Sequence, residues 1–153
     1  DVVINNPLLE ILVEGMGHIN FAQFMIDRKG ITDRVTLNGM TLMNWNMYPM
    51  PVDYEFMKNG LSRTAGMSDD KEGIFFAGKF DLSTTGDTYF DMSRYSKGVV
   101  YVNGHNLGRY WNIGPQQRLY CPAGWLKKGE NEIIVLDLHQ KDAGVISGKT
   151  SLE

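Results

Sequence analysis

The sequence predicts an all-β fold of the sandwich or barrel kind. Short runs with alternating apolar residues recur along the chain, and nearly all of them are bounded by Gly, Pro, Asn or Asp. No segment carries a sustained apolar stripe at helical spacing, and the strand–helix alternation of a parallel sheet is missing. The length of 153 residues suits one domain, so we expect a single domain over residues 1–153.

The first third of the chain is expected to supply a strand and a hairpin. Residues 8–14 (LLEILVE) alternate apolar and acidic side chains with a period of two, which predicts a half-buried strand. Asn38-Gly39 follows a second alternating run, and Asn-Gly favours a tight hairpin because both turn positions need a positive φ. Residues 41–50 are then predicted to return as a strand. Residues 53–58 suit one helical turn, and residues 59–72 suit a polar loop.

The remaining strands are expected at short intervals. A hairpin is predicted over residues 97–111 around Asn103-Gly104, with Leu107 and Tyr110 returning to the core. The run from Ile133 to Leu136 is apolar on both faces, which indicates a central strand covered on each side. The other predicted strands are residues 73–80, 87–92, 98–103, 116–121 and 132–138.

Composition excludes several classes of partner. The formal net charge is -3 and Lys and Arg form no cluster, so we expect no nucleic-acid partner. No apolar run approaches the roughly 20 residues of a membrane-spanning helix. Cys121 is the only cysteine, so no internal disulfide can form and the compartment stays open. The first residues, DVVINNP, carry no signal-like segment, and we expect the chain to be a piece of a longer product.

The run from Gly86 to Leu138 contains VNGHNLGRYW, IGPQQ and LYCP in close succession, and it resembles the C-terminal part of β-galactosidases of glycoside hydrolase family thirty-five. Residues 9–31 resemble the start of the same domain. The resemblance implies a galactose-binding-like jelly-roll sandwich. It also implies two catalytic glutamates on a (β/α)₈ barrel upstream, for which this sequence has no counterpart. An extracytoplasmic location, periplasmic, secreted or lysosomal, is implied by the family alone.

Catalytic and metal sites find little support in the residues. A (β/α)₈ barrel needs about 250 residues with alternating strands and helices, which this chain does not offer. Carboxylate pairs such as Asp69-Asp70 and Glu130/Glu132 are predicted to fall in polar turns and are interpreted as solvated surface. No cofactor is expected, and no metal ligands are assigned, although residues 68–73 (SDDKEG) leave a calcium site open. Cys121 is interpreted as a packed small apolar residue.

Four residues after the second hairpin are the candidates for a carbohydrate contact. An aromatic ring beside guanidinium and amide groups is the composition that stacks on a sugar ring and bonds its hydroxyls. Core packing is the alternative for the aromatic residue. The candidates are Arg109, Trp111, Asn112 and Gln116.

The sequence therefore predicts a non-catalytic accessory domain of a β-galactosidase, inactive alone, which supports the barrel in hydrolysis of terminal β-galactosides. The alternatives are a carbohydrate-binding module that contacts galactosides and, less well supported, an autonomous hydrolase. The expected partners are the catalytic barrel and a neighbouring β domain of the parent chain. Five methionines crowd residues 40–57 around Trp45 and Tyr48, and part of this segment is predicted to dock on one of those partners.

Overall fold

The computed structural model describes residues 8–15, 17–64 and 73–152. The chain divides into two compact units, residues 1–48 and 49–153. The alternating pattern of residues 8–14 predicts a half-buried strand, but the side chains of Leu9, Ile11 and Val13 are between 43% and 50% exposed.

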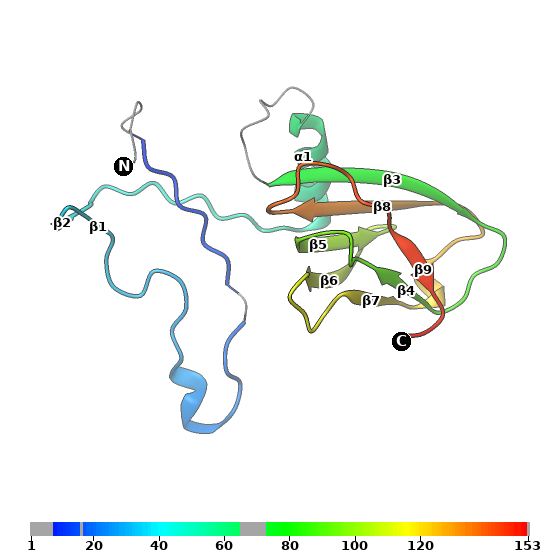
Figure 1. Ribbon diagram of the computed structural model, residues 1–153, viewed down its shortest axis with the longest axis horizontal. Helices are drawn as coiled ribbons and strands as arrows, with labels where there is room; N and C mark the ends of the chain where they lie inside the picture. Colours follow the sequence, from blue (N-terminus) through cyan, green and yellow to red (C-terminus); the bar gives the residue numbers. More distant parts are fainter. Residues whose placement is uncertain (1–7, 16, 65–72, 153) are drawn as a thin grey trace. The chain divides into compact units, whose positions relative to one another are not determined.

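The second unit is an antiparallel β-sandwich (Figure 1), which confirms the all-β prediction. One sheet has the strand order β3-β8-β5-β6 and the other has the order β7-β4-β9. The strands are β3 (Ile74–Leu82), β4 (Thr88–Asp91), β5 (Lys97–Val102), β6 (His105–Trp111), β7 (Arg118–Cys121), β8 (Gly129–Asp137) and β9 (Ser147–Lys149). A short 3₁₀ turn, η2 (Ala123–Trp125), follows β7.

Strand β8 lies between β3 and β5, as its double-sided apolar pattern predicts. Ile133 and Val135 pack into the cluster between the two sheets. Ile134 and Leu136, which alternate with them, pack into a second cluster on the outer face of the sheet. A strand that is apolar on both faces is stable only where both faces are covered, and this one is.

The helix α1 (Tyr54–Thr64) covers that outer face, and the sequence-based expectation of one turn followed by a loop is too short. The Asp53 carboxylate caps the helix by accepting a 2.8 Å hydrogen bond from the N–H of Phe56. Met57 is completely buried against the sheet, and Leu61 packs one turn later. Tertiary packing extends the helix beyond what its modest local pattern indicates.

The first unit has little regular structure. It contains a 3₁₀ turn, η1 (Ala22–Ile26), and the two-residue strands β1 (Thr36–Leu37) and β2 (Met40–Thr41). The Asn38-Gly39 turn is present, with φ of 50° and 82°. Residues 8–14 and 42–48 are not strands, contrary to prediction. In the described residues the β1-β2 ladder ends just beyond Thr41, where the Leu42 N–H donates to the Val35 carbonyl at 2.9 Å, and residues 8–14 pair with no strand.

The methionine-rich segment is divided between the two units. Met57 is part of the core of the second unit, so it cannot belong to a docking surface. The methionines before it are exposed, most strongly Met43 at 77% and Met47 at 88%. The predicted docking segment is therefore limited to residues 40–50.

Candidate functional site

The hairpin of β5 and β6 is fixed by its turn. Asn103 and Gly104 both have positive φ, 49° and 85°, as the Asn-Gly pair predicts. The Asn103 amide donates to the Trp125 carbonyl at 2.7 Å and to Oδ1 of Asn131 at 2.8 Å, and its oxygen accepts the N–H of Glu132 at 3.0 Å. These bonds tie the turn to η2 and β8, so the turn closes the sheet and leaves little polar capacity for a ligand.

The second arm of the hairpin contains a bulge. Val100 lies opposite Gly108 and Tyr101 lies opposite Asn106, so Leu107 is an extra residue in β6. The bulge shifts the alternation of side chains between the two faces of β6. Leu107 and Tyr110 consequently both pack into the apolar cluster between the two sheets, as predicted. Tyr110 is 2% exposed.

Three of the four candidate sugar contacts lie at the end of β6 or after it: Trp111 is the last residue of β6, and Asn112 and Gln116 follow in the loop to β7. The N–H of Trp111 donates to the Gln116 carbonyl at 3.1 Å. The Asn112 carbonyl accepts the Gln117 side-chain amide at 2.6 Å. Arg109 lies two residues before Trp111 on β6, so these two residues share one face of the strand.

Trp111 is not an open stacking platform on both sides. The ammonium of Lys97 lies 4.1 Å from the centroid of its ring, in a cation–π contact. Lys97 and Trp111 are register partners on β5 and β6, so the contact is a cross-strand pair. Lys97 therefore covers one face of the indole ring of Trp111.

A polar hollow lies beside this loop, and Gln116 is the only one of the four candidates that lines it. It is a shallow hollow open to solvent, with a volume of about 620 Å³, at the ends of β4 and β7. Asp91 and Arg118, register partners on these strands, form an ion pair at 3.5 Å on its wall. The remaining lining residues are Ser93, Pro115, Gln117 and Leu152.

The carboxylate of Asp91 is held in its charged form. A hydrogen bond from Ser93 is the main cause that lowers the pKa of Asp91, and Arg118 lowers it further. The Ser93 N–H donates to Oδ1 at 3.0 Å, while Arg118 faces Oδ2. The hollow therefore holds one negative and one positive group, and their charges cancel. Sequence reasoning missed Asp91 and Arg118, because only strand pairing brings them together.

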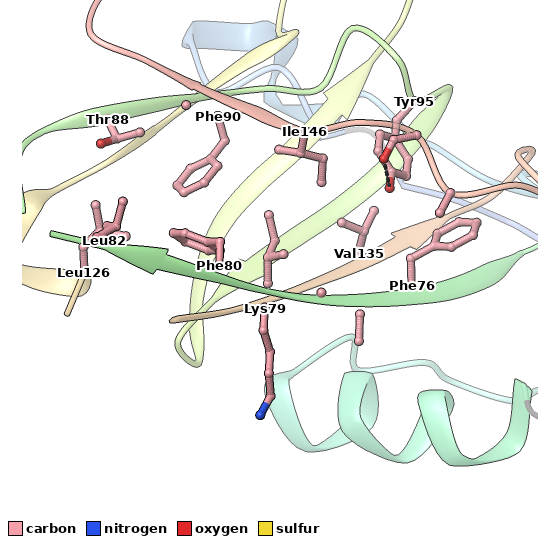
Figure 2. Close-up of a pocket in the computed structure, with 16 residues that line it drawn as sticks. Phe76, Lys79, Phe80, Leu82, Thr88, Phe90, Tyr95, Leu126, Val135 and Ile146 are labelled. Carbon is pink, nitrogen blue, oxygen red and sulfur yellow. Dashed lines mark hydrogen bonds between the residues drawn. The ribbon is translucent and has the colours of Figure 1, made fainter. Parts of the chain in front are cut away.

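An apolar cleft of about 350 Å³ opens between the two sheets (Figure 2). Phe76 and Phe80 on β3 face Phe90 and Ile146 across it, while Lys79 points to the opposite side of β3, where α1 lies. The Tyr95 hydroxyl, at one end, donates to the Gly144 carbonyl at 3.1 Å. The cleft is continuous with the core and offers few groups for acid–base chemistry.

The remaining reactive groups are occupied or buried. Glu130 pairs with Lys79 at 2.9 Å, and Glu132 accepts a 2.7 Å hydrogen bond from Tyr54; both glutamates lie on β8 rather than in a turn. Cys121 is completely buried, and burial, with a smaller effect of Asp87, raises its pKa to about 11. It is a packed apolar residue, as expected.

Metal and membrane features were sought in the part of the chain that the structure describes. No three His, Cys, Asp or Glu side chains converge there in a way that could hold a metal ion. No described helix is both long and apolar enough to cross a membrane. Most of the possible calcium segment, residues 68–72, lies outside the described residues, as does the Asp69-Asp70 pair.

Comparison with known proteins matches both units. Residues 74–131 match the family model described as "Beta-galactosidase, galactose-binding domain", and residues 3–51 match the one described as "Beta-galactosidase, first all-beta domain". The galactose-binding-like jelly roll predicted for the sandwich is thereby confirmed.

Curated relatives are similar over most of this chain. Human beta-galactosidase-1-like protein 2 is 39% identical over an alignment of 134 residues that covers 85% of this chain and 21% of that protein. Beta-galactosidase 17 of Arabidopsis thaliana is 38% identical over an alignment of 151 residues that covers 87% of this chain and 22% of that protein. Mouse beta-galactosidase is 33% identical over an alignment of 149 residues that covers 85% of this chain and 23% of that protein. The chain thus spans under a quarter of each of these three relatives.

Proposed function

The chain belongs to the β-galactosidase family through its first all-β and galactose-binding domains, and we propose that it is a non-catalytic accessory part of such an enzyme. In this role it supports the catalytic (β/α)₈ barrel in hydrolysis of terminal β-galactosides. The proposed partners are that barrel and a neighbouring β domain of the same parent chain.

One observation carries this proposal. The described residues between 8 and 50 include no buried side chain, although they are rich in large apolar ones. Leu9, Ile11 and Val13, on one face of an extended segment, are between 43% and 50% exposed. Ordering a segment without a core has an entropic cost that no burial offsets, so it needs apolar surface from elsewhere. The match of residues 3–51 to a β domain of β-galactosidases supports a neighbouring β domain of the parent chain as the source of that surface.

The second unit supports the same role through its carboxylates. Asp137 accepts hydrogen bonds from the N–H groups of Ser96, His139 and Gln140, so it acts as a structural acceptor. Asp91, Glu130 and Glu132 have partners described above. A retaining glycosidase needs two carboxyl groups roughly 5 Å apart across a sugar-sized cleft. The inter-sheet cleft has no carboxylate among its lining residues.

The proposal is tested in a whole enzyme. The region of mouse beta-galactosidase that matches this chain is deleted, or replaced by these 153 residues, and turnover of a nitrophenyl β-galactoside is measured with the yield of folded enzyme. We expect the deletion to abolish folded, active enzyme and the replacement to restore it at least in part. A deleted enzyme with unchanged activity and melting temperature would contradict the supporting role.

A matched pair of variants tests the apolar contact. In the replacement chimera, Ile11→Lys should lower the yield and the melting temperature, because it places a charge on the face that needs apolar cover. Glu10→Lys, one residue away on the other face, should have little effect. Equal effects of the two substitutions would show that the apolar face of residues 8–14 makes no contact with another domain of the enzyme.

A further inference from the structure

Strand β3 is an edge strand with one side that no described strand covers. In the described part of the chain it pairs only with β8, and β9, at the edge of the other sheet, pairs only with β4. Both edge strands line the apolar cleft (Figure 2). We propose that an extended segment of the parent enzyme, with apolar residues at alternate positions, pairs with β3 and places those residues in the cleft. The proposal rests on the accessory role, because the segment comes from the part of the enzyme outside these 153 residues.

The backbone of β3 offers hydrogen bonds along its uncovered side. In an antiparallel sheet the N–H and C=O of one residue point to the same side, and successive residues alternate. The Leu138 N–H donates to the Lys97 carbonyl at 2.8 Å, so even-numbered residues of β8 bond to β5 and odd-numbered ones bond to β3. The partners of those odd-numbered residues on β3 are even-numbered, as Phe76 opposite Val135 is. The backbone groups on the uncovered side therefore belong to Phe75, Ala77, Lys79 and Asp81, of which the last three are exposed. Such a row of backbone donors and acceptors is the template that an added strand needs.

The cleft is present because both edge strands have a glycine at an inward-facing position. Gly78 lies between Phe76 and Phe80 on β3, and Gly148 lies on β9. A Cβ added to Gly78 would lie 3.4 Å from a methyl group of Ile133, so β8 forms the floor of the cleft at this point. An apolar cavity of about 150 Å³ holds benzene. With about 350 Å³, the cleft has room for more than one aliphatic side chain.

The surroundings of β3 indicate which chemistry the added segment needs. Its residues on the inner face meet the phenylalanines of the cleft, whereas those on the outer face lie beside the exposed Lys79 and Asp81. A segment with alternating apolar and polar residues meets both requirements. A second copy of this chain is a poorer partner, because its own Phe76 and Phe80 already line its own cleft and cannot fill this one. The chain spans under a quarter of the three relatives compared above, so a whole enzyme has many segments that can supply the strand.

The test compares amide hydrogen exchange in the isolated 153-residue chain and in the mouse beta-galactosidase chimera that carries it, read residue by residue by mass spectrometry. We expect the four amides on the uncovered side of β3 to exchange at least tenfold more slowly in the chimera. The amides of Phe76, Gly78 and Phe80, which bond to β8, are internal controls and should be protected in both proteins.

The outcomes of the exchange experiment separate this inference from the accessory role. An active chimera in which the four amides stay unprotected would overturn the inference and leave the accessory role intact. Protection already present in the isolated chain would also overturn it, and loss of that protection on dilution would assign the edge to a second copy. If the chimera does not fold, the accessory role fails, and unprotected amides in the aligned strand of intact mouse beta-galactosidase would overturn the inference as well.

A substitution that fills the cleft should have opposite effects in the two proteins. Gly78→Val should raise the melting temperature of the isolated chain, because a β-branched side chain suits a strand and occupies empty apolar space. In the chimera it should lower the melting temperature and the yield, because it takes the place of the incoming side chains. Ala77→Val is the matched control, since this exposed residue points to the other face of β3, and it should affect both proteins alike. A Gly78→Val substitution that shifts both proteins equally would show that the cleft is not filled in the enzyme.

Discussion

The hydroxyl of Tyr110 donates a 2.9 Å hydrogen bond to Oδ2 of Asp137, and both residues are at most 2% exposed. The bond joins β6, the edge strand, to the end of β8, two strands away in the sheet. Burial is the main cause that raises the pKa of Tyr110, and the Asp137 charge raises it further, so the phenol remains a donor. The hydrogen bond therefore ties the bulged edge strand β6 to strand β8 in the interior of the same sheet.

Removing this donor should destabilise the second unit. Tyr110→Phe keeps the ring but leaves a buried carboxylate oxygen with fewer partners, and we expect a loss of about 1.5–3 kcal/mol in the free energy of unfolding, measured with urea. Tyr89→Phe on β4, whose ring packs on Tyr120 at 5.4 Å, is the control and should change stability by less than about 0.5 kcal/mol. Equal losses in the two variants would contradict a specific role for the Tyr110 hydroxyl.

Gly98 should tolerate no side chain, because β5 passes too close to β8. A Cβ at this position would lie 1.7 Å from the Leu136 carbonyl oxygen and 2.7 Å from the Tyr110 hydroxyl. Gly98→Ala should therefore cost more than about 3 kcal/mol or prevent folding. Gly124→Ala meets no atom within 4 Å and serves as the control in the same thermal melts. A Gly98→Ala variant with the melting temperature of the wild type would show that the strands can separate at little cost.

Gly104 tests the turn of the hairpin. Its φ of 85° is unfavourable for a β-branched residue, so Gly104→Val should lower stability by more than about 1 kcal/mol. Gly104→Asn should cost less, because Asn enters the left-handed region more readily. Space is not the limiting factor, since a Cβ here lies 3.6 Å from the Tyr54 ring. If Val and Asn have the same effect, backbone strain is not the cause.

Much of the sandwich was predictable because its strands carry local signals. The alternation of apolar and polar residues located β3, β4, β5 and β7. The run from Ile133 to Leu136, apolar on both faces, correctly predicted that β8 lies between two other strands. The short β9 was not predicted, since its sequence, Ser-Gly-Lys, has no apolar alternation. The full length of α1 was also missed, because Met57 and Leu61 give only a short stripe and the sheet beneath them completes the helix.

The polar hollow was only partly predictable. Gln116 was proposed from its place beside an aromatic residue, whereas Asp91 and Arg118 lie 27 positions apart and meet only through the register of β4 and β7. Single-sequence reasoning has no access to that register. In the first unit, alternation indicated which side chains are apolar on one face but could not show that the described residues 8–48 leave them exposed.

Cys121 predicts a specific loss of stability in alkali. Its pKa is raised from 9.0 to about 11, so above pH 9 the unfolded chain releases the thiol proton while the folded chain keeps it. The free energy of unfolding should therefore fall as the pH rises from about 9 to 11. Relative to Cys121→Ala, which has no thiol, the wild type should lose about 2 kcal/mol over this range in urea titrations. Parallel pH profiles of the two proteins would contradict the raised pKa.

The exposed methionines predict that the isolated chain associates with itself. Met43 at 77% and Met47 at 88% exposure lie beside Trp45 and Tyr48, which are 41% and 82% exposed, and flexible thioethers next to aromatic rings form adaptable apolar contacts. Replacing Met43 and Met47 together by Gln keeps their length and removes most of the apolar character, so sedimentation should show a smaller share of oligomers. Asn46→Gln, in the same segment, leaves a polar residue polar and is the control. If association is as strong after the double methionine substitution as before it, residues 40–50 are not the surface that docks.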